Sequence, residues 1–279
     1  MKHVLDRIRT EQRVVGRQDE LTALLACVAA ARHVLLEGPV GVGKTALARA
    51  LADALGRGLV RVDGDGRYTE ARLVGQFDPP LVLERGYVRE AFLPGPLVRA
   101  MQDGAVLLLN ELNRMPEGVQ NVLLPALDEG LVVVPHYGEV RAAEGFLVMA
   151  TQNPAEFVAT GDLSEALMDR FELVRLDYQS AEDEAQIVRQ QARSAPSEDV
   201  IAQAVALTRA TRGHLRVRRG ASVRAAIAIA DIATHLGGDV QRAAQLALPT
   251  RIELVDPRGT DLPQLLDELK KKTSLNSLQ

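Results

Sequence analysis

The stretch GPVGVGKT, from Gly38 to Thr45, decides the fold of this chain. It follows the apolar run HVLLEG, which is typical of a buried strand, and precedes TALARALADALG, whose spacing predicts a helix. The pattern G-x-x-x-x-G-K-[ST] in that setting indicates a loop that binds nucleotide phosphates. Gly41 and Gly43 let backbone N–H groups curl around the anion, and the helix N-terminus faces it. Lys44 is expected to reach the β- and γ-phosphates, and the Thr45 hydroxyl to bind magnesium. The predicted nucleotide-binding residues are Gly38, Pro39, Val40, Gly41, Val42, Gly43, Lys44, Thr45 and Ala46.

A second buried strand is predicted at AVLLLNELNRMP, from Ala105 to Pro116, and it ends in Asn110 and Glu111. Parallel strands gather their carboxyl ends at one edge of a sheet, so this polar pair should lie beside the phosphate loop. We expect Glu111 to polarise the attacking water and Asn110 to be the magnesium-side residue. An amide there can accept a hydrogen bond from a metal-bound water but adds no negative charge. The alternative is a solvated strand end.

The next apolar strand, FLVMATQNP, brings Gln152 and Asn153 to the same predicted edge. An amide in that place can hold the attacking water or sense the γ-phosphate. Taken alone, an Asn-Pro pair indicates only a turn. The position after a buried strand favours the functional interpretation, and Asn153 is the residue we select.

Strands alternate with helices up to about Asp177, which predicts a parallel α/β sheet with right-handed crossovers. Residues 67–95 are rich in Gly and Pro and are expected to form an irregular functional insertion, and 131–145 to form a hairpin. From Ser180 onward the pattern is helical only. We therefore predict an α/β nucleotide-binding domain over 1–178 and a small all-helical domain with a C-terminal tail over 179–279.

Composition narrows the classes of function. The 279 residues are 47% hydrophobic and 25% charged, an ordinary globular mixture, and the net charge is −4. Aromatic residues are only 3%, so stacking platforms for bases are scarce and nucleic acid is not the expected partner. The single Cys27 predicts a buried apolar residue and fits a reducing compartment. The chain is expected to be cytoplasmic, without a signal peptide or a membrane-inserted segment.

Several separated motifs together resemble the AAA+ ATPases and, within them, the MoxR group. They are VVGRQDEL with the phosphate loop, LPGPL, NELNRMPEGVQNVLLPALDEG, FLVMATQNP, LSEALMDRFEL and GASVRAAIAIA, in that order between Val14 and Ile227. The resemblance assigns Walker A to Gly38, Gly43, Lys44 and Thr45, Walker B to Asn110 and Glu111, and sensor 1 to Asn153. The chain departs from the group at Asn110, where Walker B usually has Asp, and at Val223, where Pro is usual.

The same resemblance implies two further arginines in the site. Arg170 would be the arginine finger, which reaches the γ-phosphate bound by the adjacent subunit and can raise turnover by about 10³–10⁵-fold. Arg224 would be sensor 2 and would connect the helical lid to the phosphates. On residue pattern alone, Arg170 is an ordinary surface arginine and Arg224 the polar face of an Ala/Ile helix.

Fold and partners are also implied by the resemblance. We expect a five-stranded sheet in the order 5-1-4-3-2, a helical lid, a hexameric ring, and ATP with Mg²⁺ as ligands. The group remodels or matures partner complexes in a chaperone-like way, often with a partner that carries a von Willebrand factor A domain. The insertion at 67–95 and the hairpin would face the pore or the client.

Three functional hypotheses result. The leading one is a MoxR-type ATPase that remodels a client or adaptor protein. The second is a nucleotide-gated assembly module that turns over slowly because Asn110 weakens the metal site. The third is a translocase on DNA or RNA, suggested by a basic run that contains Arg212, Arg216, Arg218 and Arg219. The acidic net charge and the few aromatic residues argue against the third, and we prefer to interpret the run as a solvated loop.

Overall fold

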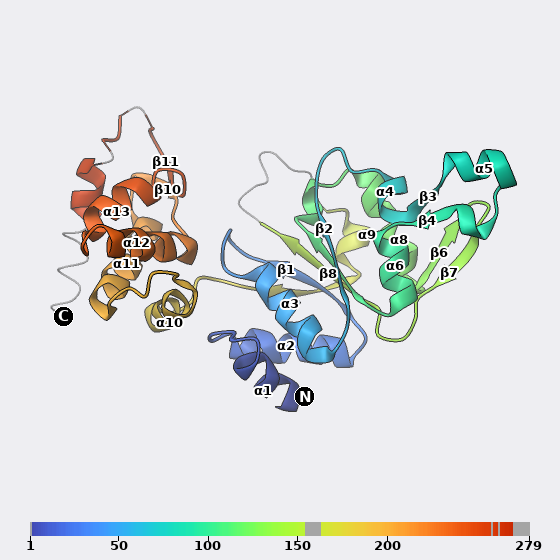
Figure 1. The fold of residues 1–279 in the computed structure, drawn as a ribbon, viewed down its shortest axis with the longest axis horizontal. Coiled ribbons are helices and arrows are strands. Elements are labelled where there is room, and N and C mark those ends of the chain that lie inside the picture. The colour runs from blue at the N-terminus through green and yellow to red at the C-terminus, as the bar shows by residue number, and fades with distance from the viewer. Residues whose placement is uncertain (1, 154–162, 258, 262, 270–279) are drawn as a thin grey trace. The chain divides into compact units, whose positions relative to one another are not determined.

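The computed structural model describes residues 2–153, 163–257, 259–261 and 263–269 (Figure 1). It divides into two compact units. The first comprises Met1–Pro39 and Gly43–Asp177, and the second comprises Val40–Val42 and Tyr178–Gln279. The C-terminal tail expected at 270–279 lies outside the described residues. Among the helices described, none has both the length and the apolar content to cross a membrane.

A five-stranded parallel sheet forms the centre of the first unit, in the order β2-β5-β8-β1-β9. Its strands are β1 (His33–Glu37), β2 (Leu59–Asp63), β5 (Val106–Asn110), β8 (Leu147–Gln152) and β9 (Phe171–Arg175). When the five strands are numbered 1 to 5 in chain order, the sequence of neighbours starting from β9 is 5-1-4-3-2. The predicted fold class and strand order are therefore confirmed.

Strands β5 and β8 provide most of the buried residues of the sheet. All six residues of β8 and the first four of β5 are buried, as expected for strands covered on both faces. Leu107 and Val148 pack in one cluster with Met101 of α6 (Pro96–Asp103) and Leu123 of α8 (Leu123–Asp128). Helix α3 (Lys44–Leu55) also contacts β5 and β8 and buries the apolar side of its amphipathic pattern.

The insertion at 67–95 is more regular than its sequence suggests. It contains α4 (Glu70–Val74), α5 (Pro79–Arg85) and the antiparallel pair β3 (Gly75–Phe77) and β4 (Phe92–Pro94). Gly75 has a φ of 131°, and a Cβ there would lie 2.5 Å from the carbonyl oxygen of Leu93. Gly75, which in the sequence indicates a loop, instead permits the close approach of β3 and β4. The predicted hairpin is present as β6 (Leu131–Val134) and β7 (Gly138–Arg141).

One helical segment of the first unit is interrupted. The run PEGVQNVLLPALDEG, at 116–130, has the apolar spacing of one helix but is divided at Val122 into α7 (Glu117–Asn121) and α8. Pro125 has no N–H to donate to the carbonyl four residues earlier, so the helix cannot run on unbroken. The N-terminal lead forms α1 (Lys2–Thr10), followed by α2 (Gln18–Ala29), and α9 (Glu165–Met168) precedes β9.

The second unit is helical with one exception. Its helices are α10 (Ala181–Gln191), α11 (Glu198–Ala210), α12 (Val223–His235) and α13 (Val240–Ala247). The Ser180 and Ser197 side chains cap α10 and α11, accepting hydrogen bonds from backbone N–H groups of the first turn. The prediction of an all-helical domain is wrong in detail, because β10 (Val217–Arg219) pairs antiparallel with β11 (Glu253–Leu254). These strands are only three and two residues long, too short to leave a period-two pattern.

Candidate functional site

The phosphate loop joins β1 to α3, and its glycines are required by backbone geometry. Gly41 and Gly43 have backbone φ values of 80° and 96°, which residues with a Cβ atom rarely adopt. A Cβ on Gly38 would lie 2.1 Å from the carbonyl oxygen of Leu176. Gly43 is also the N-cap of α3, so the free N–H groups of the first helical turn are directed toward the loop.

Lys44 is the first residue of α3 and lies back over the loop. Its ammonium donates hydrogen bonds to the carbonyl oxygens of Gly38 and, at 2.9 Å, Pro39. A compact cation with three donors is therefore already held above the curve of the loop. A nucleotide phosphate in that curve would accept those hydrogen bonds in place of the carbonyls.

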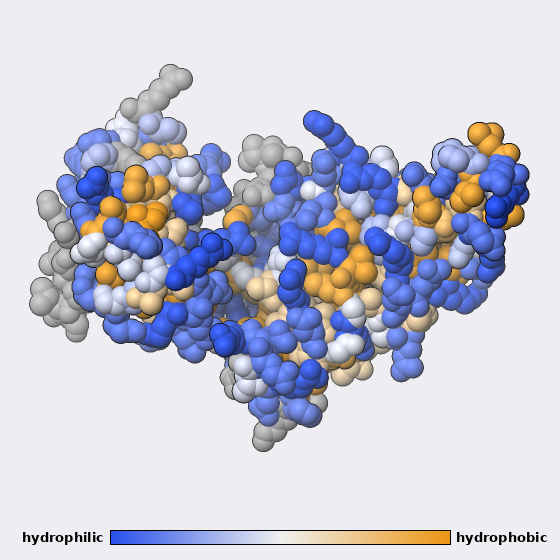
Figure 2. All heavy atoms as spheres, viewed as in Figure 1, coloured by the Kyte–Doolittle hydropathy of each residue, from blue (hydrophilic) through white to orange (hydrophobic). Residues whose placement is uncertain are grey.

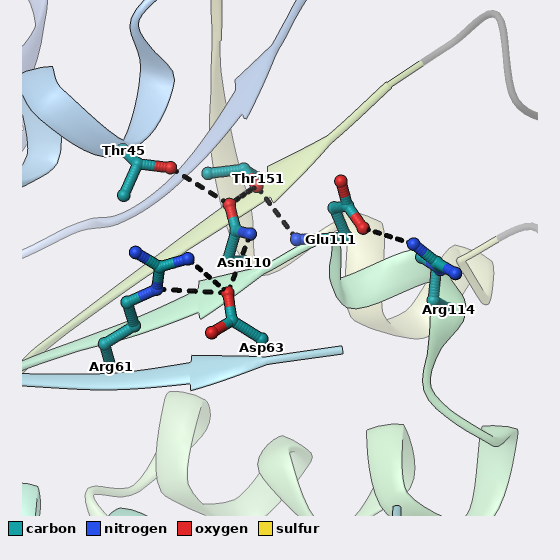
Figure 3. Close-up of polar contacts among 7 residues, drawn as sticks. All are labelled: Thr45, Arg61, Asp63, Asn110, Glu111, Arg114 and Thr151. Atoms are coloured by element: carbon teal, nitrogen blue, oxygen red, sulfur yellow. Dashed lines mark hydrogen bonds and ion pairs between the residues drawn. The ribbon is translucent and has the colours of Figure 1, made fainter. Parts of the chain in front are cut away.

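The end of β5 is joined to the loop through Asn110 (Figure 3). The Asn110 Oδ1 atom accepts hydrogen bonds from the hydroxyl of Thr45 at 3.1 Å and from that of Thr151, in β8, at 3.0 Å. The Asn110 amide nitrogen donates to Oδ1 of Asp63, the last residue of β2, at 2.9 Å. Arg61 also binds Asp63 and holds the pKa of that carboxyl below its usual value. Three strands and one helix thus converge on one amide.

Glu111 follows Asn110 with its backbone in the left-handed region, at φ 57° and ψ 52°. Its N–H donates to the Thr151 hydroxyl at 2.9 Å, which holds this turn against β8. Its carboxylate accepts a hydrogen bond from Arg114 at 2.7 Å and is one third exposed. A partly exposed carboxylate that directly follows Asn110, the residue joined to Thr45 of the phosphate loop, is suited to polarise a water molecule.

The two amides after β8 differ in what they contact. Gln152 donates to the Glu37 carboxylate at 2.7 Å, and Arg175 donates to the same carboxylate at 3.1 Å. The Gln152 amide therefore contacts the end of β1 through Glu37. Asn153 is 4% exposed and directly follows β8, at the edge where the phosphate loop begins. Its role as a sensor of the γ-phosphate stays a prediction.

Magnesium is compatible with the oxygens gathered here. The Thr45 hydroxyl, the Asn110 amide and the Asp63 carboxylate are hard oxygen donors of the kind Mg²⁺ prefers. Within the described residues, no group of three or more His, Cys, Asp or Glu side chains forms a possible metal cage. The donor set therefore suits a Mg²⁺ ion that is bound largely through waters and nucleotide phosphates.

Arg170 lies at the opposite ends of the strands from the phosphate loop, at the amino edge of the sheet. It directly precedes β9, and the first residue of β9, Phe171, pairs with His33, the first residue of β1. The Arg170 guanidinium binds the Asp128 carboxylate through two nitrogens, at 2.8 and 2.7 Å, and also the carbonyl of Ala166. The hydrogen bond that Arg170 donates to the Asp128 carboxylate raises the pKa of Arg170. The structure therefore does not bring Arg170 together with the phosphate loop of its own chain.

His33 and Arg224 complete the residues of interest. His33 Nδ1 accepts the backbone N–H of Val148 at 3.0 Å, and burial lowers the pKa of its imidazole to about 4. Arg224 is exposed in the first turn of α12, in the second unit. Its predicted contact with the phosphates stays a prediction.

Sequence reasoning missed Asp63 and Thr151. Both stand at the carboxyl ends of strands of the central sheet, in register with or next to residues that it had selected. The rule that such ends meet at one edge would have found Asp63, because the run LVRVD reads as a strand that ends in an acid. Thr151 gives no such signal, since a threonine within an apolar strand is usual.

Sequence comparisons agree with this geometry. A family model described as an AAA domain of the dynein-related subfamily matches residues 33–171. The uncharacterized protein YeaC of Bacillus subtilis is 31% identical over 86% of this chain and 83% of its own length. The gas vesicle ATPase GvpN2 of Halobacterium salinarum is 34% identical over 72% of this chain, and the match spans 62% of that protein.

Solved structures share the fold. A candidate ATPase from Cytophaga hutchinsonii superposes with a TM-score of 0.56 at 24% identity, covering 97% of this chain and 93% of that one. RuvB of Thermotoga maritima gives a TM-score of 0.54 at 18% identity, covering 83% of this chain and 70% of its own. At these identities the likeness supports the fold alone.

Proposed function

The chain belongs to the AAA family of ATPases, and on that basis we propose that its ATP hydrolysis drives chaperone-like remodelling or maturation of a partner protein complex, as in the MoxR group. The enzyme is an ATPase, and we propose that its nucleotide site is the phosphate loop at the carboxyl edge of the sheet. We place this activity in a cytoplasmic hexameric ring. The partner is a separate client or adaptor, for which a von Willebrand factor A domain protein is one class.

The position of Arg170 carries the proposal of a ring. The full length of β1 separates the Arg170 edge from the phosphate loop, about 13 Å for the four rises of about 3.3 Å between its five residues. A cation at that edge is badly placed for the nucleotide of its own subunit. It is well placed for a nucleotide that an adjacent subunit presents across an interface, which makes hydrolysis depend on assembly.

Exposed apolar residues on the insertion and the hairpin support a protein client. Leu83 of α5 is 90% exposed, Tyr87 is 56% exposed and Val133 of β6 is 66% exposed. The Tyr87 ring stacks on His136 at a centroid distance of 4.2 Å, so the insertion and the hairpin form one surface, here called the client surface. Figure 2 shows apolar colour over α5 at the right of the view. Apolar groups of this kind are typical of protein-binding surfaces.

The basic run gives less support to a nucleic-acid substrate. Arg212 pairs with Glu184 at 2.8 Å, and Arg216 pairs with Glu268 at 3.4 Å. Arg218 and Arg219 both pair with Glu253. Three carboxylates therefore offset most of the charge of the four arginines, which leaves less positive charge for a phosphate backbone than the sequence run suggests.

Affinity capture tests the remodelling activity. The Glu111→Gln variant, loaded with ATP, should retain a client that is absent when Lys44→Ala is used. Changing Leu83 and Val133 to Ser should remove the captured protein. Leu215, in the second unit, is 96% exposed and provides the matched control. The Leu215→Ser variant should capture the client as well as the parent protein does. Capture that does not depend on nucleotide or on the client surface would contradict the proposal.

The ring is tested by dilution. Turnover per subunit should fall on dilution over the same protein concentrations at which sedimentation shows the assembly dissociating. Constant turnover per subunit from a species that sediments as a monomer would contradict the shared site.

A nucleotide-gated module with slow turnover is the second candidate, and Asn110 is the observation that favours it. Its amide contacts Thr45, the hydroxyl expected to bind magnesium, without adding charge. Turnover should then require high magnesium, and Asn110→Asp should lower that requirement. Equal turnover of both proteins at low magnesium would remove the reason for this candidate.

A further inference from the structure

Asp63 lies beside Asn110 because of the sheet itself. The β2–β5 ladder pairs Asp63 with Asn110 at the last position of both strands. Side chains at paired positions of neighbouring parallel strands lie on the same face of a sheet. The acid is therefore set next to the magnesium-side position by backbone pairing rather than by a flexible loop.

Hydrogen bonds determine which way the Asn110 amide faces. Its oxygen accepts from two hydroxyls, those of Thr45 and Thr151, and its nitrogen donates to the Asp63 carboxylate. The carboxylate decides this orientation, because the reverse one would set the amide oxygen against a carboxylate that cannot donate, whereas the two hydroxyls can donate or accept. Asn110 thus connects the hydroxyl of the phosphate loop to an acid one strand away (Figure 3).

One oxygen of Asp63 carries all of its contacts. Asn110 and both nitrogens of Arg61 donate to Oδ1, at 2.9, 3.0 and 2.6 Å. Among the described residues, Oδ2 has no hydrogen-bond partner. The side chains of Arg61 and Asp63 are 41% and 60% exposed, and an ion pair so exposed to water is weak. Arg61 therefore leaves the Asp63 carboxylate usable by a cation.

We propose that Asp63 supplies the negative charge that Asn110 lacks at the magnesium site, so that the acid of this site stands at the end of β2 instead of β5. Magnesium retains several waters and takes one or two carboxylates in addition to phosphate oxygens. Asp63 is the carboxylate that contacts the Thr45–Asn110 network directly, whereas Glu111 is paired with Arg114. This inference rests on nucleotide binding at the phosphate loop.

Magnesium-dependent nucleotide binding tests the role of Asp63 without relying on turnover. The affinity of the full chain for a fluorescent ADP analogue is measured in EDTA and across a magnesium titration, and Mn²⁺ binding is followed by electron paramagnetic resonance. Asp63→Asn keeps an oxygen that can accept from Asn110 but removes the charge, whereas Asp63→Ala removes both. Asp65→Asn, whose carboxylate accepts the backbone N–H of Arg67, is the matched control for charge.

We expect Asp63→Asn to raise the magnesium concentration for half-maximal effect by about 10- to 100-fold, the loss typical of residues that support a metal site. Affinity in EDTA should stay unchanged, as should the titration of Asp65→Asn. Adding Asn110→Asp to Asp63→Asn should restore the wild-type titration and the Mn²⁺ signal, because the charge returns one strand away.

Two results would overturn the inference in different ways. If Asp63→Asn titrates like the wild type, Asp63 supplies no charge to the site, and a defect confined to Asp63→Ala would assign it only the orientation of the Asn110 amide. If the wild type itself binds no nucleotide, or binds it without regard to magnesium, the nucleotide site fails and this inference fails with it.

Discussion

The two edges of the central sheet carry polar residues in different states. At the carboxyl edge, Asn110 and Glu111 lie beside a glycine loop and are partly exposed. At the amino edge, Arg170 is bound to Asp128, and His33 is held neutral by burial. The same five strands therefore support a carboxyl edge whose polar residues join the glycine loop through Thr45, and an amino edge whose cation is held away from that loop.

This difference indicates how the work of hydrolysis is divided. The carboxyl edge provides the phosphate cradle and the acid for water, and its arginines Arg61, Arg114 and Arg175 are each bound to a carboxylate of the same edge. The amino edge carries Arg170, which is bound to Asp128. We propose that a complete site combines the carboxyl edge of one copy with the amino edge of the next, and the predictions below test this proposal.

The largest effect is expected at the amino edge. Arg170→Ala should lower turnover by about 10³-fold or more, the contribution of a cation that stabilises the transferred phosphoryl group. ATP affinity, measured by calorimetry, should change little, since Arg170 does not approach the phosphate loop of its own chain. Asp128→Asn is the control, because it loosens the Arg170 ion pair but keeps the cation, and it should retain turnover. Equal losses in both variants would mean that the pair serves the fold only.

At the carboxyl edge, Glu111→Gln should lower turnover by about 10²–10⁴-fold, the range for loss of a general base. The amide keeps the size of the side chain, so nucleotide binding should persist. A radiolabelled ATP hydrolysis assay, together with an ATP binding isotherm, separates the two quantities. Turnover within a few-fold of the wild type would exclude Glu111 as the residue that activates water.

The amino edge should also dominate the acid sensitivity of the fold. His33 has a pKa of about 4 in the folded chain and 6.5 in the unfolded chain, so the unfolded state binds its proton first. The stabilisation is complete above pH 6.5 and is lost as the pH falls toward 4. At 1.36 kcal/mol per pKa unit, we expect about 2–3 kcal/mol to be lost between pH 7 and 4.5. Urea unfolding of His33→Gln should lack this component, and identical pH profiles would contradict it.

Thr151→Val should have the smallest effect. It removes the hydroxyl that accepts from the Glu111 N–H and donates to Asn110, and it leaves a buried strand otherwise unchanged. We expect a loss of about 1–2 kcal/mol in unfolding free energy and about tenfold in turnover, because the Glu111 turn loses its acceptor. Thr22→Val, on the exposed side of α2, is the control and should change stability by less than about 0.5 kcal/mol.

The sequence predicted the nucleotide edge well because its signals are local. GPVGVGKT contains its own glycines, lysine and threonine within eight residues, and VLLLNE contains a buried strand and its polar end. Strand order followed from the resemblance and is confirmed by the register of the five strands.

The partners of those residues were not predictable, because each lies far away in the chain. Asn110 meets Asp63 across 47 residues and Thr151 across 41, and Arg170 meets Asp128 across 42. The pairs β3–β4 and β10–β11 were missed for a similar reason, since strands of two or three residues leave no periodic pattern. Contacts of this kind follow from strand register, which a single sequence does not reveal.

The central claim is that one active site takes its phosphate loop and Glu111 from one copy and Arg170 from another. Mixing Glu111→Gln with Arg170→Ala tests it directly, since neither variant should hydrolyse ATP alone. In mixed assemblies, the intact site of an Arg170→Ala copy would meet the Arg170 of a Glu111→Gln neighbour. We predict that the mixture recovers a substantial fraction of wild-type turnover. A mixture no more active than the average of its two inactive components would contradict the account.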